Sequence, residues 1–269
     1  MFAVLGDPVA HSLSPQLQNA AFTDSGIDAV YVALHCDADR LPGLMRGITA
    51  ARGGGNVTLP HKALARRTIE RATEAVERTG ACNTFWCDGG ALWGDNTDVV
   101  GVRRSVASLL EQDAKDARVL LLGAGGAARA AMYAFISDRA GEVVVLNRSA
   151  HRARDLIARF EPAPTRLRLA PSIGSLANES FDLVVNATSL GLRPDDPLPL
   201  PLDAPLHVAA ALDLVYTPDG TAWCRAHSSR GTPAADGIEM LLYQGAAAFE
   251  RWTGVDAPLA AMRDALPPR

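Results

Sequence analysis

The stretch Val119-Leu120-Leu121-Leu122-Gly123-Ala124-Gly125-Gly126-Ala127-Ala128 decides the fold. Its four leading apolar residues predict a buried strand, and the alanine-rich residues 129–137 predict a helix directly after the turn. Gly123 allows the tight turn, Gly125 removes a side chain that would block a pyrophosphate, and Ala128 allows close packing of helix on sheet. The free N–H groups at the helix N-terminus then bind phosphates. The stretch therefore predicts a Rossmann-type domain that binds a dinucleotide.

The residues after the next predicted strand, 143–146, distinguish NAD from NADP. An NAD site needs Asp or Glu here to accept hydrogen bonds from the ribose 2′-hydroxyl. The chain instead has Asn147-Arg148-Ser149-Ala150-His151-Arg152. Arg148 and Arg152 can bind a 2′-phosphate through charge-assisted hydrogen bonds, whereas a carboxylate would repel it. Because cations are unfavourable in the first turn of a helix unless they bind something, the pattern indicates NADP.

Strands and helices alternate along the chain, which is typical of α/β proteins. The first hundred residues predict a largely parallel sheet, and Ser14 is expected to cap the first helix ahead of Pro15. The alternation restarts at residue 118 and predicts a doubly wound sheet. The expected strands are 2–5, 30–34, 119–122, 143–146, 181–186 and 209–214, and the expected helices are 14–25, 39–51, 129–137, 150–160 and 238–253.

Length and composition exclude several classes of protein. The 269 residues are about twice the usual length of one domain, and 48% apolar with 21% charged residues is too apolar for a disordered chain. A net charge of −4 is too small for a nucleic-acid binder. No apolar run approaches the ~20 residues of a membrane span, and the N-terminus lacks the basic start of a signal peptide. We therefore expect a cytoplasmic enzyme. The four Cys and six His lack the spacing of metal ligands, so we expect no metal. Each Cys is expected to be a small buried residue.

Only two of the 26 Lys and Arg residues are lysines, Lys62 and Lys115. Lys115 lies in the polar stretch 112–116, which is expected to be a solvated linker. Lys62 ends Asn56-Val57-Thr58-Leu59-Pro60-His61-Lys62, which follows three glycines. Since Arg is effectively never deprotonated and Lys can exchange a proton, Lys62 is a candidate for proton chemistry. A chance surface lysine is the alternative interpretation.

An ordered series of short motifs runs along the chain. The motifs are Gly6-Asp7-Pro8, His11-Ser12-Leu13-Ser14-Pro15, Asn56 to Lys62, Gly80-Ala81-Cys82-Asn83-Thr84, Gly94-Asp95-Asn96-Thr97-Asp98, Gly123 to Ala128, Asn186-Ala187-Thr188-Ser189, Asp213-Leu214-Val215-Tyr216-Thr217-Pro218, and Asp236-Gly237 through Gln244. The set resembles the shikimate dehydrogenase family, in family order, over essentially the whole chain. The resemblance implies NADP-dependent interconversion of shikimate and 3-dehydroshikimate, a step toward chorismate and the aromatic amino acids. It also implies that residues 1–100 with 237–269 form a substrate-binding domain completed by the C-terminal helix, and that 101–236 form the NADP-binding domain.

The resemblance implies a substrate site that recognises one carboxylate and three hydroxyls. Ser12 and Ser14 match the hydroxyls that bind the carboxylate, although helix capping is the alternative role for serines in this position. Outside the family, amide and hydroxyl side chains of this kind are more often satisfied by backbone groups. The residues implied to contact substrate are Ser12, Ser14, Asn56, Thr58, Lys62, Asn83, Asp98, Tyr216 and Gln244.

Lys62 and Asp98 match the catalytic lysine of the family and its carboxylate partner. In the reduction direction, we expect the Lys62 ammonium to protonate the carbonyl oxygen as hydride arrives. Asp98 is expected to hold Lys62 and a neighbouring substrate hydroxyl in line. The two groups titrate jointly, so the sequence leaves open which of them is the base in the oxidation direction.

The resemblance also implies a set of cofactor contacts. Leu214 and Gly237 suit packing and a turn equally well. Gln18 departs from the family, which commonly has His there, and we expect it to alter the pocket rim without much effect on chemistry. The implied contacts are Glu74, Gly123, Ala124, Gly125, Gly126, Ala127, Asn147, Arg148, Ser149, Arg152, Leu214 and Gly237.

Two alternatives stay open. The first is a quinate or quinate/shikimate dehydrogenase, or a paralogue acting on an amino-substituted shikimate analogue; relatives that favour quinate tend to have Thr at the position of Ser14, and several prefer NAD. The second is a catalytically silent NADP-binding sensor on the same fold, which would be free to lose Lys62 and Asp98. We expect a small-molecule substrate and no nucleic-acid or membrane partner, and the family includes monomers and homodimers.

Overall fold

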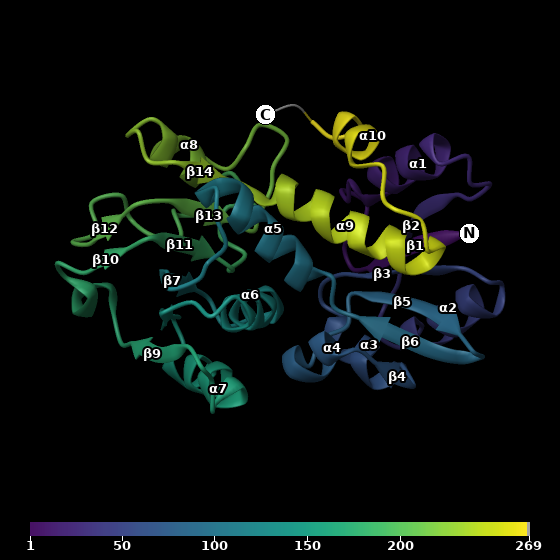
Figure 1. Ribbon diagram of the computed structural model, residues 1–269, viewed down its shortest axis with the longest axis horizontal. Coiled ribbons are helices and arrows are strands. Elements are labelled where there is room, and N and C mark those ends of the chain that lie inside the picture. Colours follow the sequence, from purple (N-terminus) through teal and green to yellow (C-terminus); the bar gives the residue numbers. More distant parts are fainter. Residues whose placement is uncertain (268–269) are drawn as a thin grey trace. The chain divides into compact units, whose positions relative to one another are not determined.

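The computed structural model describes residues 1–267 and divides into two compact units (Figure 1). Unit 1 comprises Met1–Asp98 together with the segment that begins at Leu241, and unit 2 comprises Val99–Met240. The chain leaves unit 1 at the start of α5 (Asp98–Leu110) and returns in the first turns of α9 (Gly237–Thr253). The C-terminal segment therefore belongs to the same unit as the N-terminal strands.

Unit 1 contains a six-stranded mixed sheet in the order β2-β1-β3-β5-β6-β4. Pairs β1–β2, β1–β3 and β4–β6 are parallel, whereas β3–β5 and β5–β6 are antiparallel. The prediction of a largely parallel sheet thus missed a hairpin between β5 and β6, which Gly89 and Gly90 close with positive φ angles of 57° and 80°. The strands are β1 Phe2–Gly6, β2 Tyr31–His35, β3 Gly54–Val57, β4 Arg71–Ala72, β5 Thr84–Asp88 and β6 Ala91–Asp95.

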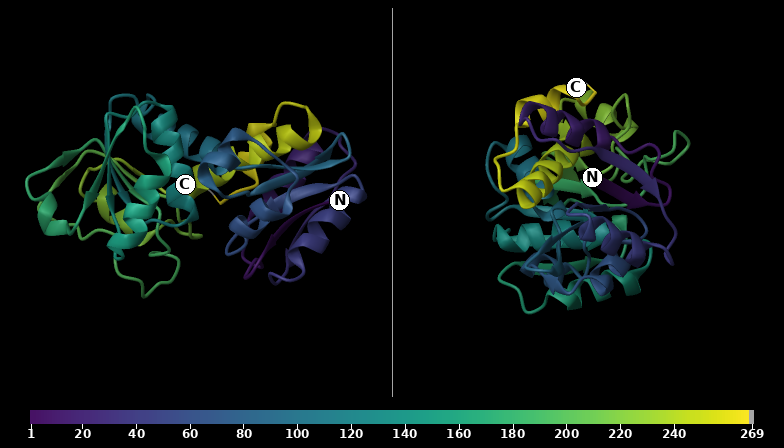
Figure 2. Two further views of the ribbon diagram at one scale, coloured as in Figure 1. Left: turned by 90° about the horizontal axis from the view of Figure 1, so that it is seen from below. Right: turned by 90° about the vertical axis from the view of Figure 1, so that its right-hand side faces the viewer.

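The helices of unit 1 bury apolar residues against this sheet and against one another. Phe22 of α1 packs on Phe249 of α9 with ring centroids 5.5 Å apart, and both views in Figure 2 show α10 beside α1. Burying large aromatic rings of this kind contributes strongly to a core, so the C-terminal segment is an integral part of the unit. Besides α9, the helices are α1 Ser14–Asp24, α2 Leu41–Ala50, α3 Lys62–Thr68, α4 Glu74–Thr79 and α10 Leu259–Asp264.

Unit 2 contains a six-stranded, fully parallel sheet in the order β14-β13-β11-β7-β8-β9. Its central strands are buried almost throughout, as expected of strands covered on both faces. Figure 1 shows α6 and α7 on one face and α8 on the other, which confirms the doubly wound fold. The elements are β7 Arg118–Leu122, α6 Gly126–Ser137, β8 Glu142–Leu146, α7 Ala150–Phe160, β9 Arg166–Ala170, β11 Leu183–Asn186, β13 Ala211–Asp213, α8 Ala222–Ser228 and β14 Ala234–Ala235, with a 3₁₀ turn at Ile173–Leu176 and a separate pair β10 Ser180–Phe181 and β12 His207–Val208.

Two properties of the described residues bear on the sequence predictions. Cys36, Cys82 and Cys224 are buried thiols, but Cys87 is exposed near the end of β5, so the prediction that every cysteine is buried was wrong there. Within residues 1–267, none of the helices has the length and apolar character needed to cross a bilayer.

Candidate active site

Lys62 and Asp98 form a closely paired ammonium and carboxylate in unit 1. Lys62 is the first residue of α3 and Asp98 the first residue of α5, and Lys62 Nζ lies 2.6 Å from Asp98 Oδ2. Their side chains are 19% and 6% exposed, so the pair is largely removed from water but still reachable. The preceding residue, His61, is fixed by a 2.8 Å hydrogen bond between its Nε2 and the Cys36 carbonyl. The structure thus brings together the two residues that the sequence predicted as catalytic.

Asn83 holds the second oxygen of Asp98. Its Nδ2 donates to Asp98 Oδ1 over 2.8 Å and lies 3.4 Å from Gln244 Oε1. Its Oδ1 accepts from the backbone N–H of Thr97 over 2.8 Å. Because a backbone N–H is always a donor, this contact fixes the orientation of the Asn83 amide, and the NH₂ group must face Asp98. Lys62, Asn83, Asp98 and Gln244 therefore form one connected polar cluster.

Asn56 is a neighbour of this cluster, but its amide is already occupied. Nδ2 donates to the Asn83 carbonyl over 3.2 Å and to Thr84 Oγ1 over 2.9 Å, which uses both amide hydrogens. Oδ1 accepts from the Tyr31 hydroxyl over 2.6 Å. The structure thus gives the Asn56 amide protein partners, and its contact with a substrate hydroxyl stays a prediction.

Three polar residues of this network escaped prediction as site residues: Tyr31, Thr84 and Thr97. Thr84 and Thr97 stand inside motifs quoted above, so their position next to Asn83 and Asp98 was an available signal. Tyr31 begins β2 and carries no motif. Tyr31 reaches Asn56 only because β2 and β3 lie on either side of β1 in the folded sheet.

Ser12 and Ser14 lie at the start of α1. The prediction that Ser14 caps this helix was wrong: Leu13 is the N-cap, without a side-chain hydrogen bond, and Ser14 is the first helical residue. Ser12 Oγ instead accepts from the Ser14 backbone N–H over 3.3 Å. The Ser14 hydroxyl makes no hydrogen bond within the described part of the chain, although the residue is only 6% exposed. It is therefore available to a ligand.

Thr58 follows β3, and its position depends on Gly6 at the end of β1. The Thr58 backbone N–H donates to the Leu5 carbonyl over 2.9 Å. A Cβ at Gly6 would lie 2.3 Å from Thr58 Cγ2, so a side chain at position 6 would displace Thr58. This close approach explains why glycine stands at the end of β1.

Gln18 does not lie at a pocket rim, contrary to the prediction. It is 0% exposed, and its Nε2 donates to the Gly245 carbonyl of α9 over 2.8 Å. This side chain therefore joins α1 to α9 inside unit 1. The return of the C-terminal helix to this unit was predicted, but its contact with Gln18 was not.

In unit 2, the turn between β7 and α6 has the shape of a phosphate cradle. Gly123 has a φ of +109°, and a Cβ there would lie 2.9 Å from the Ala187 carbonyl oxygen, so the turn requires glycine. Cβ atoms at Gly125 and Gly126 would meet no atom within 4 Å, which leaves open space over the N-terminus of α6. Ala124 and Ala127 complete this turn. The open backbone at a helix N-terminus fits a pyrophosphate.

The end of β8 fits a 2′-phosphate. Asn147 Nδ2 donates to the Ser149 carbonyl over 2.9 Å, and Ser149 Oγ caps α7 by accepting from the Arg152 backbone N–H over 3.4 Å. The Arg148 and Arg152 side chains are exposed, and neither forms an ion pair with a residue in the described range. Two unpaired guanidiniums beside an open phosphate cradle fit NADP, as predicted from the sequence.

The remaining predicted contacts lie apart from these groups in the chain. Glu74 is the exposed first residue of α4 in unit 1, whereas Tyr216 follows β13 in unit 2. A Cβ at Gly237 would lie 2.6 Å from the Leu214 carbonyl oxygen, so Gly237 is needed for packing against Leu214. The contacts of these four residues, Glu74, Leu214, Tyr216 and Gly237, with substrate or cofactor remain predictions.

Asp213, at the end of β13, is a buried carboxyl group beside the Leu214 loop. Its Oδ1 accepts from Asn186 Nδ2 over 2.7 Å and from the Val215 backbone N–H over 3.0 Å. Burial, together with the charge of Asp236, raises the pKa of Asp213 from 3.8 to about 6 against the opposing effect of its hydrogen bonds. Folding therefore favours the protonated form of this carboxyl group.

We expect Asp213→Asn to stabilise the protein at pH 8 by up to about 3 kcal/mol, since each unit of pKa shift is equivalent to about 1.4 kcal/mol. The ionised carboxylate destabilises the fold above about pH 6, and this effect disappears as the pH falls toward 4. The Asn oxygen can still accept both hydrogen bonds. Urea unfolding at pH 8 and pH 4.5 measures the difference, with exposed Asp219→Asn as the control. An equal stability gain at both pH values would contradict the assignment.

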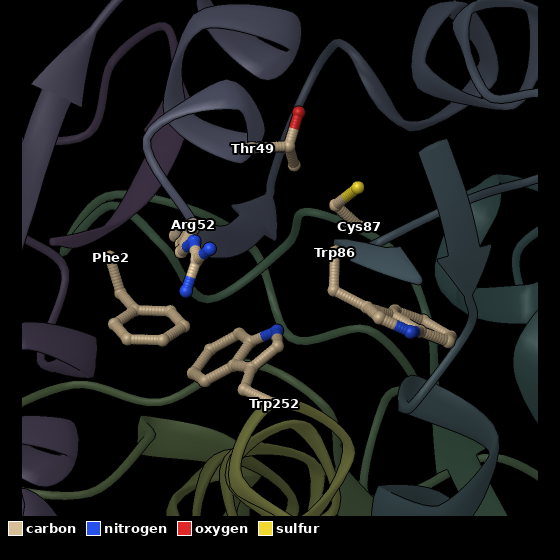
Figure 3. A pocket seen from close by; sticks show the side chains of 7 residues that line it. Phe2, Thr49, Arg52, Trp86, Cys87 and Trp252 are labelled. Carbon is tan, nitrogen blue, oxygen red and sulfur yellow. The ribbon is translucent and has the colours of Figure 1, made fainter. Parts of the chain in front are cut away.

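A pocket in unit 1 lies away from the polar cluster (Figure 3). Its cavity has a volume of about 300 Å³ and is lined by Phe2, Thr49, Arg52, Trp86, Cys87 and Trp252, together with Gly53. Gly54 pairs with Phe2 and Trp86 at this end of β3, whereas Asn56 pairs with Thr84 toward the other end. None of the predicted site residues lines this pocket. We therefore place the chemistry at the polar cluster, where the titratable groups are.

Three family models match the chain. Residues 4–85 match "Shikimate dehydrogenase substrate binding domain", residues 105–191 match "Shikimate / quinate 5-dehydrogenase", and residues 237–266 match "Shikimate 5'-dehydrogenase C-terminal domain". The matches follow the chain in the order of the motifs described above.

Individual relatives match over nearly their whole length. The chain is 40% identical to a shikimate dehydrogenase (NADP(+)) of Halobacterium salinarum over 267 residues, which are 99% of this chain and 98% of that protein. A structure of shikimate dehydrogenase from Aquifex aeolicus superimposes with a TM-score of 0.88 at 32% identity, covering 98% of this chain and 96% of that one. A structure of shikimate 5-dehydrogenase from Thermus thermophilus in complex with NADP(H) and shikimate gives a TM-score of 0.87 at 36% identity, covering 98% and 97%.

Proposed function

Because the chain belongs to the shikimate dehydrogenase family, we propose that it catalyses the reversible NADP-dependent reduction of 3-dehydroshikimate to shikimate. It is an oxidoreductase that acts on a CH–OH group and uses NADP. In this proposal unit 1 binds the substrate and unit 2 binds the cofactor. The observation that carries it is the Lys62–Asp98 pair, held at 2.6 Å in unit 1 and supported by Asn83.

The reaction needs a proton donor for the carbonyl oxygen in one direction and a proton acceptor for the alcohol in the other. The Lys62 ammonium can donate a hydrogen bond to the carbonyl oxygen and then protonate it. This stabilises negative charge as it develops on oxygen. Asp98 orients the ammonium from one side, and its position beside Lys62 allows it to accept a hydrogen bond from a neighbouring substrate hydroxyl.

Substrate recognition is assigned mainly to polar side chains of unit 1 in and around the polar cluster. The Ser14 hydroxyl, with Ser12 beside it, is proposed to bind the carboxylate. Thr58 and Gln244 are proposed to contact ring hydroxyls, and Tyr216 of unit 2 is carried over from the family as a further contact. Asn56 is proposed to support the site from within the protein, because both of its amide hydrogens are bonded there, and a contact of its Oδ1 with substrate stays a prediction.

The residues of unit 2 are proposed to hold NADP in three places. The glycine-rich turn holds the pyrophosphate, and Arg148 and Arg152, with Asn147 and Ser149, hold the 2′-phosphate. Glu74, Leu214 and Gly237 are the further contacts that the family implies. When bound, the nicotinamide supplies or accepts the hydride.

An activity matrix tests the proposal: shikimate and quinate are each offered with NADP⁺ and with NAD⁺, and reduced cofactor is followed by absorbance. We expect the highest kcat/KM for shikimate with NADP⁺. A higher kcat/KM for quinate would shift the substrate assignment, because preference is the ratio of these constants. No turnover by folded protein with any pair would contradict the proposal and favour a silent NADP-binding protein.

A further inference from the structure

A one-way series of hydrogen bonds runs from the start of β2 to Asp98. The Tyr31 hydroxyl donates to Asn56 Oδ1 over 2.6 Å, and Asn56 Nδ2 donates to Thr84 Oγ1 over 2.9 Å. Thr84 Oγ1 donates to Asn83 Oδ1 over 2.8 Å, and Asn83 Nδ2 donates to Asp98 Oδ1 over 2.8 Å. We call these five residues the Tyr31 relay. It ends on the oxygen of Asp98 that Lys62 does not contact.

Backbone groups fix the direction of the Tyr31 relay. The Asn83 carbonyl can only accept, so the group of Asn56 that faces it must be NH₂, and Asn56 Oδ1 must face Tyr31. The Thr97 N–H can only donate, so Asn83 Oδ1 faces it, and Asn83 NH₂ faces Asp98. Reversal of either amide would place two acceptors or two donors together. The Thr84 hydroxyl accepts from Asn56 and has Asn83 Oδ1 at 2.8 Å as its nearer acceptor, with Thr97 Oγ1 at 3.0 Å as a second neighbour. Hydrogen bonds that share one direction strengthen one another.

Tyr31 is held as a permanent donor at the head of this series. It is 1% exposed, and burial raises the pKa of its hydroxyl well above 10, so the group stays neutral and protonated. The Asn19 side chain binds the backbone N–H and C=O of Tyr31 over 2.8 Å and 2.9 Å. The Tyr31 ring packs on Trp252 with centroids 5.9 Å apart. Its hydroxyl therefore points at Asn56 from a fixed position.

We propose that Tyr31 is a positioning residue for the reaction, which acts on Asp98 and Lys62 through Asn56, Thr84 and Asn83. The inference rests on the proposed function for its kinetic consequences. The five members of the Tyr31 relay are buried, each with 5% or less of the whole residue exposed, so water cannot easily replace a missing donor. Without the Tyr31 hydroxyl, Asn56 Oδ1 loses its donor, and the amide is held only by its bonds to the Asn83 carbonyl and Thr84 Oγ1. The Thr97 backbone N–H still holds the Asn83 amide, so the effect reaches Asp98 as a weaker hydrogen bond from Asn83 Nδ2, because bonds that share one direction strengthen one another.

The test compares Tyr31→Phe, Thr84→Val, Thr84→Ser and the Tyr31→Phe/Thr84→Val double variant. We expect Tyr31→Phe to lower kcat about threefold to tenfold, the equivalent of one hydrogen bond, with KM for shikimate within about twofold of wild type. Thr84→Ser keeps the hydroxyl and should retain kcat, whereas Thr84→Val should lower it by about tenfold. Because both changes interrupt the same series, the double variant should be no slower than Thr84→Val alone.

Tyr133→Phe on α6, whose ring stacks on Phe160, is the matched control for loss of a tyrosine hydroxyl. Since the chain has only two lysines, ¹⁵N-lysine labelling also gives a readout that needs no turnover. The Lys62 Nζ signal should shift in Tyr31→Phe and not in Tyr133→Phe. An unshifted signal, an unchanged kcat in Tyr31→Phe, or effects that multiply in the double variant would overturn the inference. If the Lys62 Nζ signal shifts in Tyr31→Phe but the wild-type protein does not oxidise shikimate, the proposed function fails and the positioning role stands.

Discussion

Lys62→Met is expected to lower kcat for shikimate oxidation by roughly 10²–10⁴, with little change in KM, as for loss of a general acid or base. Methionine keeps much of the length of the lysine side chain but has no proton to exchange. It also removes the ammonium that lies 2.6 Å from Asp98 Oδ2, so among residues 1–267 the carboxylate keeps only its side-chain contact with Asn83. Steady-state kinetics in both directions measures the effect.

The chain offers a matched control for this substitution. Lys115, the other lysine, is exposed in the segment before β7, so Lys115→Met makes the same change of side chain away from the polar cluster. It is expected to leave kcat unchanged. Near-normal turnover in Lys62→Met, with the protein folded by circular dichroism, would eliminate the role assigned to Lys62. A raised KM with unchanged kcat would instead make Lys62 a substrate-binding residue.

The second large effect is expected from Arg148→Ala/Arg152→Ala, which should lower kcat/KM for NADP⁺ by roughly 10². A charge-assisted hydrogen bond contributes about 1.5–3 kcal/mol, and we take the lower value for each guanidinium because both side chains are exposed. The kcat/KM for NAD⁺ should change by less than about threefold, since NAD⁺ has no 2′-phosphate to lose contact with. The ratio of kcat/KM for NADP⁺ to kcat/KM for NAD⁺ therefore decides whether the two arginines bind the 2′-phosphate.

Arg154→Ala is the matched control, because Arg154 is an exposed arginine of the same helix beyond the capping turn. It should leave the NADP⁺/NAD⁺ ratio unchanged. Equal losses with both cofactors in the double variant would show that the two arginines support the fold of this turn and do not bind the 2′-phosphate. The loss of kcat/KM for NADP⁺ in the double variant should also be smaller at high salt, as expected for exposed charges.

The elements that the sequence predicted well carry local signals. The helix over residues 150–160 has the predicted bounds, because Ser149 caps it and its apolar positions follow the helical period. The Rossmann-type turn was likewise recognised from its glycines in context, and the family resemblance is confirmed by the relatives and solved structures. The missed β5–β6 hairpin also had a local signal, Asp88-Gly89-Gly90, which was not used.

The part of the site that escaped prediction is not encoded locally. Tyr31, Asn56 and Thr84 are 25 and 28 residues apart in sequence, and they bond only because β1 lies between β2 and β3 while β5 pairs with β3. Neither hydrophobic period nor motif spacing reports which amide hydrogens are already used. For the same reason Gln18 was expected at a rim: its burial depends on Gly245, which lies 227 residues away. Such contacts require the folded chain.

The assembly of unit 1 from both ends of the chain has a consequence for synthesis on the ribosome. Residues 99–240 leave the exit tunnel as a complete unit, while β1–β6 still lack the helix that contributes Phe249, Gly245 and Arg251. The nascent chain therefore carries an unfinished N-terminal sheet, with Phe22 uncovered, until translation is nearly over. Unit 2 can therefore fold before unit 1 is complete. A stop codon shortly after residue 240 would leave unit 2 intact but would deprive unit 1 of most of α9 and of α10.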